Sequence, residues 1–155
     1  MIVVADTSGI IAASDRRAPE SGACRGLLGS AGAVIVSPLV LAEVDHLAKV
    51  RFGTQARHAI LDNIITQALR MRFQVPEVSP DALKLAREVQ RKYADLDLDL
   101  ADAVNVTLAA DFRTDAILTL DRRDFRAIRP LTPHKAFRVL PAGFTGFTGL
   151  PGPMT

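Results

Sequence analysis

The chain has 155 residues, of which 48% are hydrophobic and 23% are charged, and this balance is typical of a folded globular domain. A formal net charge of +2 neither requires nor excludes a nucleic-acid partner, and the single cysteine, Cys24, excludes both a disulfide framework and a cysteine-rich zinc site. The longest apolar stretches fall short of the roughly 18 residues that a membrane span requires. We therefore expect one cytoplasmic domain without a transmembrane helix or a secretory signal.

The first half of the chain predicts two strands that alternate with helices. The apolar, β-branched run at the N-terminus suits a strand that is covered on both faces. The pair Ser37-Pro38 is a typical helix start, and Gly53 is a typical helix end. A segment rich in Gly, Pro and charge before the second strand predicts a loop and a short helix. Strands are thus expected over 2–5 and 34–36, and helices over 7–13, 38–52 and 55–73.

The second half continues the alternation. Ser79-Pro80, with an acid in the next position, starts a helix that runs to about residue 94, and a further helix is expected over 100–111. Strands are predicted over 116–120 and 137–140. Strands alternating with helices indicate an α/β fold with a mostly parallel sheet. We expect a domain over 1–140, followed by a Gly/Pro-rich C-terminal tail over 141–155 that is mobile or docks on a partner.

Two of the predicted strands end on an aspartate. Residues 3–6 read VVAD and residues 118–121 read LTLD, so Asp6 and Asp121 each follow a strand directly. In parallel α/β folds, functional sites lie outside the carboxyl ends of the strands. We therefore expect Asp6 and Asp121 at the same edge of the sheet.

Two further acids lie on helices that begin near that edge. Glu43 shares its helical spacing with Leu39, Leu47 and Val50, so we expect it on the side facing the core, where an acid is costly unless it is paired. Asp102 lies in the first turn of the helix over 100–111. Four acids are therefore predicted to converge: Asp6, Glu43, Asp102 and Asp121.

Such a cluster has a defined chemistry. Carboxylates within a few ångströms of one another raise each other's pKa values unless a cation compensates them. Oxygen ligands without paired histidines or cysteines favour Mg²⁺ or Mn²⁺ over zinc. These ions, singly or as a pair about 4 Å apart, activate water and stabilise the leaving oxygen in phosphodiester cleavage. The predicted reaction class is therefore that of a metal-dependent nuclease.

Each acid by itself also has a structural alternative. Asp6 can cap the first helix, Asp102 can stabilise the dipole of its own helix, and Asp121 can be a turn residue before RRDF. Glu43 lies in mid-helix and has no capping role. The combination is more specific than any of its members.

Several neighbours of these acids are candidates for supporting roles. Asp99 and Asp124 are additional candidate ligands, with a helix cap as the alternative for each. Thr7, Ser8 and Thr119 are candidates for orienting the ligands by hydrogen bonds.

Four blocks of the sequence together resemble a known family. They are the first strand with Asp-Thr-Ser, the helix carrying Glu43, the segment DLADAVNVTLAA and the segment LTLDRRDF. In this order and approximate spacing they resemble the PIN domain and, within it, the VapC-type toxins of bacterial and archaeal toxin–antitoxin pairs. The resemblance covers about residues 1–140.

The resemblance implies a three-layer α/β/α fold with a central parallel sheet flanked by helices. It implies a Mg²⁺- or Mn²⁺-dependent endoribonuclease, usually a homodimer, that acts as the toxin of a type II pair and is neutralised by a small VapB-like antitoxin. The metal-binding and catalytic set that it implies is Asp6, Glu43, Asp102 and Asp121.

Arginines beside the predicted site are candidates for contacts with RNA phosphates, and a solvated charged face is the alternative for each of them. They are Arg16, Arg17, Arg122 and Arg123. Two other functions compete with a toxin: a housekeeping RNA-processing nuclease, and an RNA-binding or regulatory module without catalysis. A haloacid-dehalogenase-like phosphatase is disfavoured, because it needs a second aspartate where this chain has Ser8.

Overall fold

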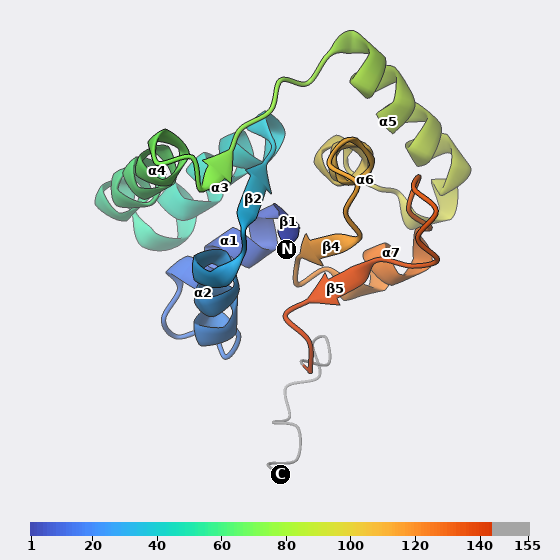
Figure 1. Cartoon of the computed structure of the whole chain (residues 1–155). Coiled ribbons are helices and arrows are strands. Elements are labelled where there is room, and N and C mark those ends of the chain that lie inside the picture. The colour runs from blue at the N-terminus through green and yellow to red at the C-terminus, as the bar shows by residue number, and fades with distance from the viewer. Residues whose placement is uncertain (144–155) are drawn as a thin grey trace.

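A five-stranded parallel sheet forms the centre of the computed structural model, which describes residues 1–143 (Figure 1). The strand order is β3-β2-β1-β4-β5, and all four neighbouring pairs are parallel. The strands are β1 (Ile2–Ala5), β2 (Ala33–Val36), β3 (Phe73–Gln74), β4 (Ala116–Leu118) and β5 (Arg138–Leu140).

Seven α-helices connect and cover the strands in the described part of the chain. They are α1 (Thr7–Ser14), α2 (Ser21–Ser30), α3 (Pro38–Phe52), α4 (Thr54–Leu69), α5 (Pro80–Lys92), α6 (Leu100–Asp111) and α7 (Arg122–Ala127). A short 3₁₀ helix, η1 (Ala94–Leu96), leads into α6. Helices α1 to α4 lie on one side of the sheet and α5 to α7 on the other (Figure 1). The predicted three-layer α/β/α fold is confirmed.

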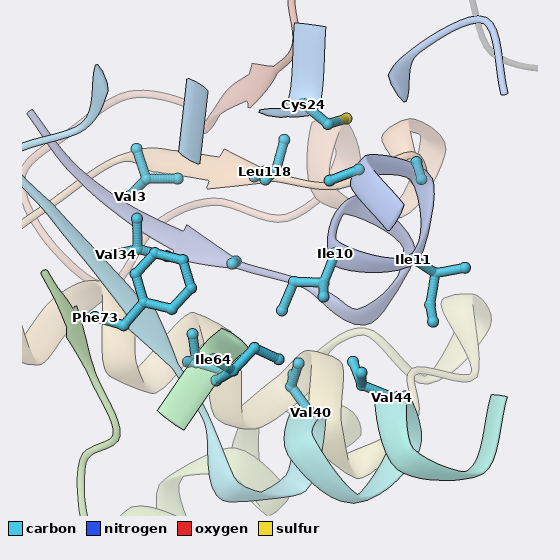
Figure 2. Packing of buried hydrophobic residues seen from close by; sticks show 14 of the residues in the cluster. Val3, Ile10, Ile11, Cys24, Val34, Val40, Val44, Ile64, Phe73 and Leu118 are labelled. Carbon is cyan, nitrogen blue, oxygen red and sulfur yellow. The ribbon is translucent and has the colours of Figure 1, made fainter. Parts of the chain in front are cut away.

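The core is divided by the sheet because successive strand side chains point to opposite faces. Val3 and Ala5 of β1 pack with α1 to α4, in the cluster that Figure 2 shows, whereas Val4 between them packs with α5 to α7. Neighbouring strands repeat the pattern, since Val34 and Val36 belong to the first cluster and Ile35 to the second. The three central strands β1, β2 and β4 are largely buried on both faces, as the apolar run of β1 predicted, whereas the edge strands β3 and β5 are partly exposed.

The helix boundaries follow the predicted signals. The Ser37 side chain accepts a hydrogen bond from the backbone N–H of Leu39, and Pro38 occupies the first turn of α3. Gly53 ends α3 and precedes α4 with a φ of 91°, which favours glycine. These signals position α3, the helix that carries Glu43.

The structure differs from the prediction at two elements. Helical periodicity was expected to continue to residue 73, but α4 ends at Leu69, and Met71 has a φ of 61°. Phe73 then pairs with Val34 as the edge strand β3, so pairing with β2 overrides the helical pattern. The segment after Asp121, for which a turn was one alternative, forms the short helix α7.

Only the first three residues of the predicted tail belong to the described part of the chain. Residues 141–143 follow β5, while 144–155 of the predicted C-terminal tail lie outside the described residues. None of the helices in residues 1–143 has the length and apolarity that a bilayer crossing requires.

Candidate metal centre at the carboxyl edge of the sheet

Two of the predicted acids flank neighbouring strands. Asp6 follows β1 and Asp121 follows β4 after two residues, and the two strands pair in parallel with Ala5 opposite Leu118. The backbone N–H of Asp6 donates to the Leu118 carbonyl at 2.9 Å. Parallel pairing therefore brings both acids to the carboxyl edge, where sites of this fold class lie.

The carboxylate of Asp6 is 5% exposed and is held by three donors. Its Oδ1 accepts from the backbone N–H of Thr7 at 2.8 Å and from Asn105 Nδ2 at 3.4 Å. Its Oδ2 accepts from Thr119 Oγ1 at 2.8 Å. Asp6 is therefore both the N-cap of α1 and a fixed member of the site, so the two interpretations of this residue are compatible.

Thr119 connects the two edge aspartates. Its hydroxyl donates to Asp6 and accepts the backbone N–H of Asp121 at 2.9 Å. Ser8 Oγ accepts the N–H of Leu120 at 2.9 Å and shares a hydrogen bond with Thr119 Oγ1 at 3.2 Å. These hydrogen bonds link Thr119 and Ser8 to the two edge aspartates, and the orienting role of both residues toward metal ligands stays a prediction.

Glu43 reaches the site from α3. Its Oε2 accepts a hydrogen bond from Thr7 Oγ1 at 3.2 Å, which ties it to the residue that follows Asp6. The expected apolar stripe was wrong in detail, since Val50 is 68% exposed and the buried stripe is Val40, Val44 and Ala48. Glu43 is next to Val44, at the flank of this stripe, and is half-buried.

Three acids form a tight group at the opening of the site. Ligand atoms of Asp102, Asp121 and Asp124 all lie within 4.8 Å of one another. Asp102 comes from the first turn of α6, and Asp124 from the first turn of α7. Asp99, exposed at the start of α6, acts electrostatically on Asp6, Glu43 and Asp102 and therefore lies at the rim.

The electrostatics of the group favour a bound cation. Burial, followed by the charges of Asp6 and Asp121, raises the pKa of Asp102 to about 8. Burial, followed by Asp124, raises the pKa of Asp121 to about 6. Burial also raises the pKa values of Asp6 and Glu43, against hydrogen bonds from Thr119 and Thr7 that lower them. Acids that repel one another in this way gain most from a divalent cation.

The residues present fit a hard divalent ion. The donor set consists of carboxylate oxygens, and the atoms of the group within 4.8 Å are close enough for one or two ions to contact them. Neither the three histidines of the chain nor Cys24, which is buried in the core, belongs to the group. This chemistry suits Mg²⁺ or Mn²⁺.

The predicted arginines do not behave alike. Arg16, Arg17 and Arg123 are exposed, as a phosphate contact requires. Arg122 is 5% exposed, and its Nη2 donates to the Pro141 carbonyl at 2.8 Å. The buried guanidinium therefore anchors the chain after β5, and the expectation that Arg122 faces RNA is corrected.

Two residues of the site were not found from the sequence. Asn105, one turn after Asp102, contacts Asp6, and the three-residue spacing on one helix is the signal that could have indicated it. Gly9 allows α1 to approach β4, because a Cβ at this position would lie 2.6 Å from Leu118 Cγ.

Comparisons with known proteins agree with the fold. The family model of the PIN domain matches residues 3–130. Ribonuclease VapC26 of Mycobacterium tuberculosis is 36% identical over 140 residues, which are 90% of this chain and all of the relative.

Solved structures share the fold. That of M. tuberculosis VapC20, a toxin that cleaves the sarcin–ricin loop, has a TM-score of 0.65 at 22% identity and covers 74% of this chain and 86% of its own. That of VapBC2 from Rickettsia felis, bound to a DNA fragment from its promoter, has a TM-score of 0.64 at 16% identity. The match covers 90% of this chain and 98% of that chain. A toxin–antitoxin complex from Klebsiella pneumoniae has a TM-score of 0.56 at 23% identity, and the match covers 86% of this chain and 98% of that chain. With the family match over most of its length and a fold and acidic edge of the expected kind, the chain belongs to the PIN domain family.

Proposed function

We propose that the protein is a metal-dependent endoribonuclease that hydrolyses RNA phosphodiester bonds and acts as the toxin of a type II toxin–antitoxin pair. The observation that carries this proposal is the convergence of acids from four separate segments on one sheet edge, in a chain 36% identical to a ribonuclease. Acids that raise one another's pKa values lower the stability of the fold. A nuclease that binds a metal ion has a use for such a cluster, whereas a binding module without catalysis has none, so the cluster favours the nuclease.

In this proposal a Mg²⁺ or Mn²⁺ ion is held by the carboxylates of Asp6, Glu43, Asp102 and Asp121, with Asp124 as a further ligand and Asp99 at the rim. The ion, when bound, supplies a Lewis acid that activates water and neutralises charge on the phosphate. The carboxylates must be ionised to hold it, so binding lowers their pKa values and releases protons.

The chain's own groups orient the ligands. Donors on both oxygens of Asp6, from Thr7, Asn105 and Thr119, fix the plane of its carboxylate. The Thr7 hydroxyl holds Glu43. The exposed guanidiniums of Arg16, Arg17 and Arg123 are proposed to hold substrate phosphates and to offset the repulsion between RNA and the acids.

The test is cleavage of RNA by purified protein with Mg²⁺ or Mn²⁺, comparing the wild type with Asp6→Asn. Asp111→Asn is the matched control, because Asp111 is an exposed acid at the far end of α6. We expect cleavage by the wild type and the control, and its loss with Asp6→Asn or with EDTA. Equal activity of the wild type and Asp6→Asn would rule out the proposed mechanism.

We propose that the antitoxin partner docks in a groove between α1, α2 and α4. The groove has a volume of about 730 Å³ and an apolar floor that includes Ile10, Leu28, Ile60, Ile64 and Phe73. Four arginines also line it: Arg16, Arg25, Arg70 and Arg72. An apolar floor with a basic lining suits a helix that is apolar on one face and acidic on the other.

The groove can be tested with a cognate antitoxin, identified as a small protein that binds this chain and inhibits its nuclease activity. Ile60→Glu introduces a charge on the floor of the groove, whose lining includes none of the proposed metal ligands, and is expected to weaken inhibition while cleavage continues. Ile65→Glu, on an exposed position of α4, is the control. Equal inhibition of all three proteins would exclude the groove as the docking site.

We also propose that the protein forms a homodimer. Its mass in solution, measured by light scattering, tests this proposal.

A further inference from the structure

Asn105 is a fully buried polar residue in the middle of α6, one turn after Asp102. Its neighbours along the helix, Val104 and Val106, are apolar and also fully buried. The amide nitrogen donates to Asp6 Oδ1 at 3.4 Å, whereas the amide oxygen has no hydrogen-bond partner among residues 1–143. An amide in this place is therefore only half satisfied.

The fold gains little from such a group. A buried polar atom without a partner lowers stability, and an apolar side chain of similar size in its place is often neutral or stabilising. Thr107 on the same helix is a contrasting case. It is also buried, but its hydroxyl has a hydrogen-bond partner within the helix, the Val104 carbonyl at 2.8 Å. Asn105 instead directs its donor across to Asp6 on β1's carboxyl end.

The chemistry of an amide suits this position. Its N–H carries no net charge, so it can hold a carboxylate without competing with a cation, whereas a lysine or arginine would neutralise the site itself. Together with the backbone N–H of Thr7 it places two donors on Oδ1, while Thr119 holds Oδ2. Rotation of the Asp6 carboxylate is thereby restricted from both sides.

We propose that Asn105 is a positioning residue of the metal centre, which orients Asp6 for the divalent ion and contributes to binding of that ion rather than to the stability of the fold. This proposal rests on the proposed function, because it assumes that the acidic edge holds an ion. It adds a residue of α6 that acts through Asp6 and not on the ion or the substrate.

The experiment compares Asn105→Leu with the wild type and with Thr107→Val, a matched control that removes a buried polar group from the same helix. Mn²⁺ affinity is measured by calorimetry, and thermal unfolding is measured in EDTA. We expect Asn105→Leu to bind Mn²⁺ about 10-fold more weakly, as is usual when a group that orients a ligand is lost. We expect it to unfold in EDTA at the wild-type temperature or above it. Thr107→Val should retain wild-type Mn²⁺ affinity.

Two results would overturn the proposal. One is Mn²⁺ binding by Asn105→Leu that equals that of the wild type. The other is failure of both Asn105→Leu and the smaller Asn105→Ala to fold, since the amide would then serve the fold. Absence of Mn²⁺ binding by the wild type would instead contradict the proposed function, so the two failures are distinguishable.

Discussion

Replacing Asp102 by asparagine is expected to stabilise the ion-free protein at alkaline pH. Burial and neighbouring charges raise the pKa of this carboxyl from 3.8 to about 8. At about 1.4 kcal/mol per unit, the full shift would correspond to about 6 kcal/mol. Asp102 is only partly buried, so solvent screens part of this energy, and about 2 kcal/mol is a more realistic penalty. Asn keeps the shape of the side chain and removes the charge.

The sign of the pH dependence follows from the raised pKa. Below pH 3.8, Asp102 is protonated in both the folded and the unfolded chain, so it adds no penalty. Between pH 3.8 and about 8 the folded chain retains the proton that the unfolded chain has lost, so stability falls as the pH rises. Above the folded pKa the penalty is complete and constant.

Thermal unfolding in EDTA from pH 4 to pH 9 measures the effect. At alkaline pH the variant should unfold about 4–8 °C above the wild type, at ~2–4 °C per kcal/mol for a domain of this size. The difference should vanish toward pH 4, and Mg²⁺ should stabilise the wild type more than the variant. Asp111→Asn, exposed on the same helix, is the control. Equal unfolding temperatures of the wild type and Asp102→Asn at alkaline pH in EDTA would refute the reasoning.

Three pairs of substitutions probe the surroundings of the site. Gly9→Ala should lower the free energy of unfolding, measured by urea titration, by about 1–3 kcal/mol, because its Cβ would lie 2.6 Å from Leu118 Cγ. Its control is Gly22→Ala, which should be neutral or stabilising because a Cβ at Gly22 would have nothing within 4 Å. Thr119→Val should weaken Mn²⁺ binding about 10- to 100-fold by calorimetry. Its control is Thr114→Val, because Thr114 bonds the Ile2 carbonyl at the opposite end of β4, and equal binding by both variants would contradict the bridging role of Thr119. Arg122→Met should destabilise the fold by about 1–3 kcal/mol, because the hydrogen bond to the Pro141 carbonyl is lost. Arg123→Ala should leave the fold intact. In filter binding it should lower the affinity for RNA and make that affinity less dependent on salt concentration.

Much of the fold could be predicted from local signals. The helix starts at Ser37-Pro38 and Ser79-Pro80 depend on caps that lie within a few residues of one another, and both caps form as expected. The helix over 100–111 has the bounds expected for it. The strand β3 could not be predicted, because two residues pair with β2 only when α4 has ended and the chain has turned at Met71.

The sequence by itself determined which chemistry is available to this protein. Acids directly after apolar strands, a mid-helix acid at position 43 and the absence of paired histidines or cysteines limit the site to oxygen ligands for a hard cation. Parallel strands place their carboxyl ends together, so the meeting of Asp6 and Asp121 could also be predicted. These conclusions depend on residue type and on the direction of strands, both of which are encoded locally.

Only the tertiary structure decided which neighbours complete the site. Asp124 joins Asp102 and Asp121 because α7 folds directly after the turn, and Arg122, two residues before it, is carried into the interior. Asn105 meets Asp6 across 99 residues of sequence. Side-chain direction and burial depend on how α6 and α7 pack on the sheet, and the spacing of residues along one helix restricts this packing without specifying it.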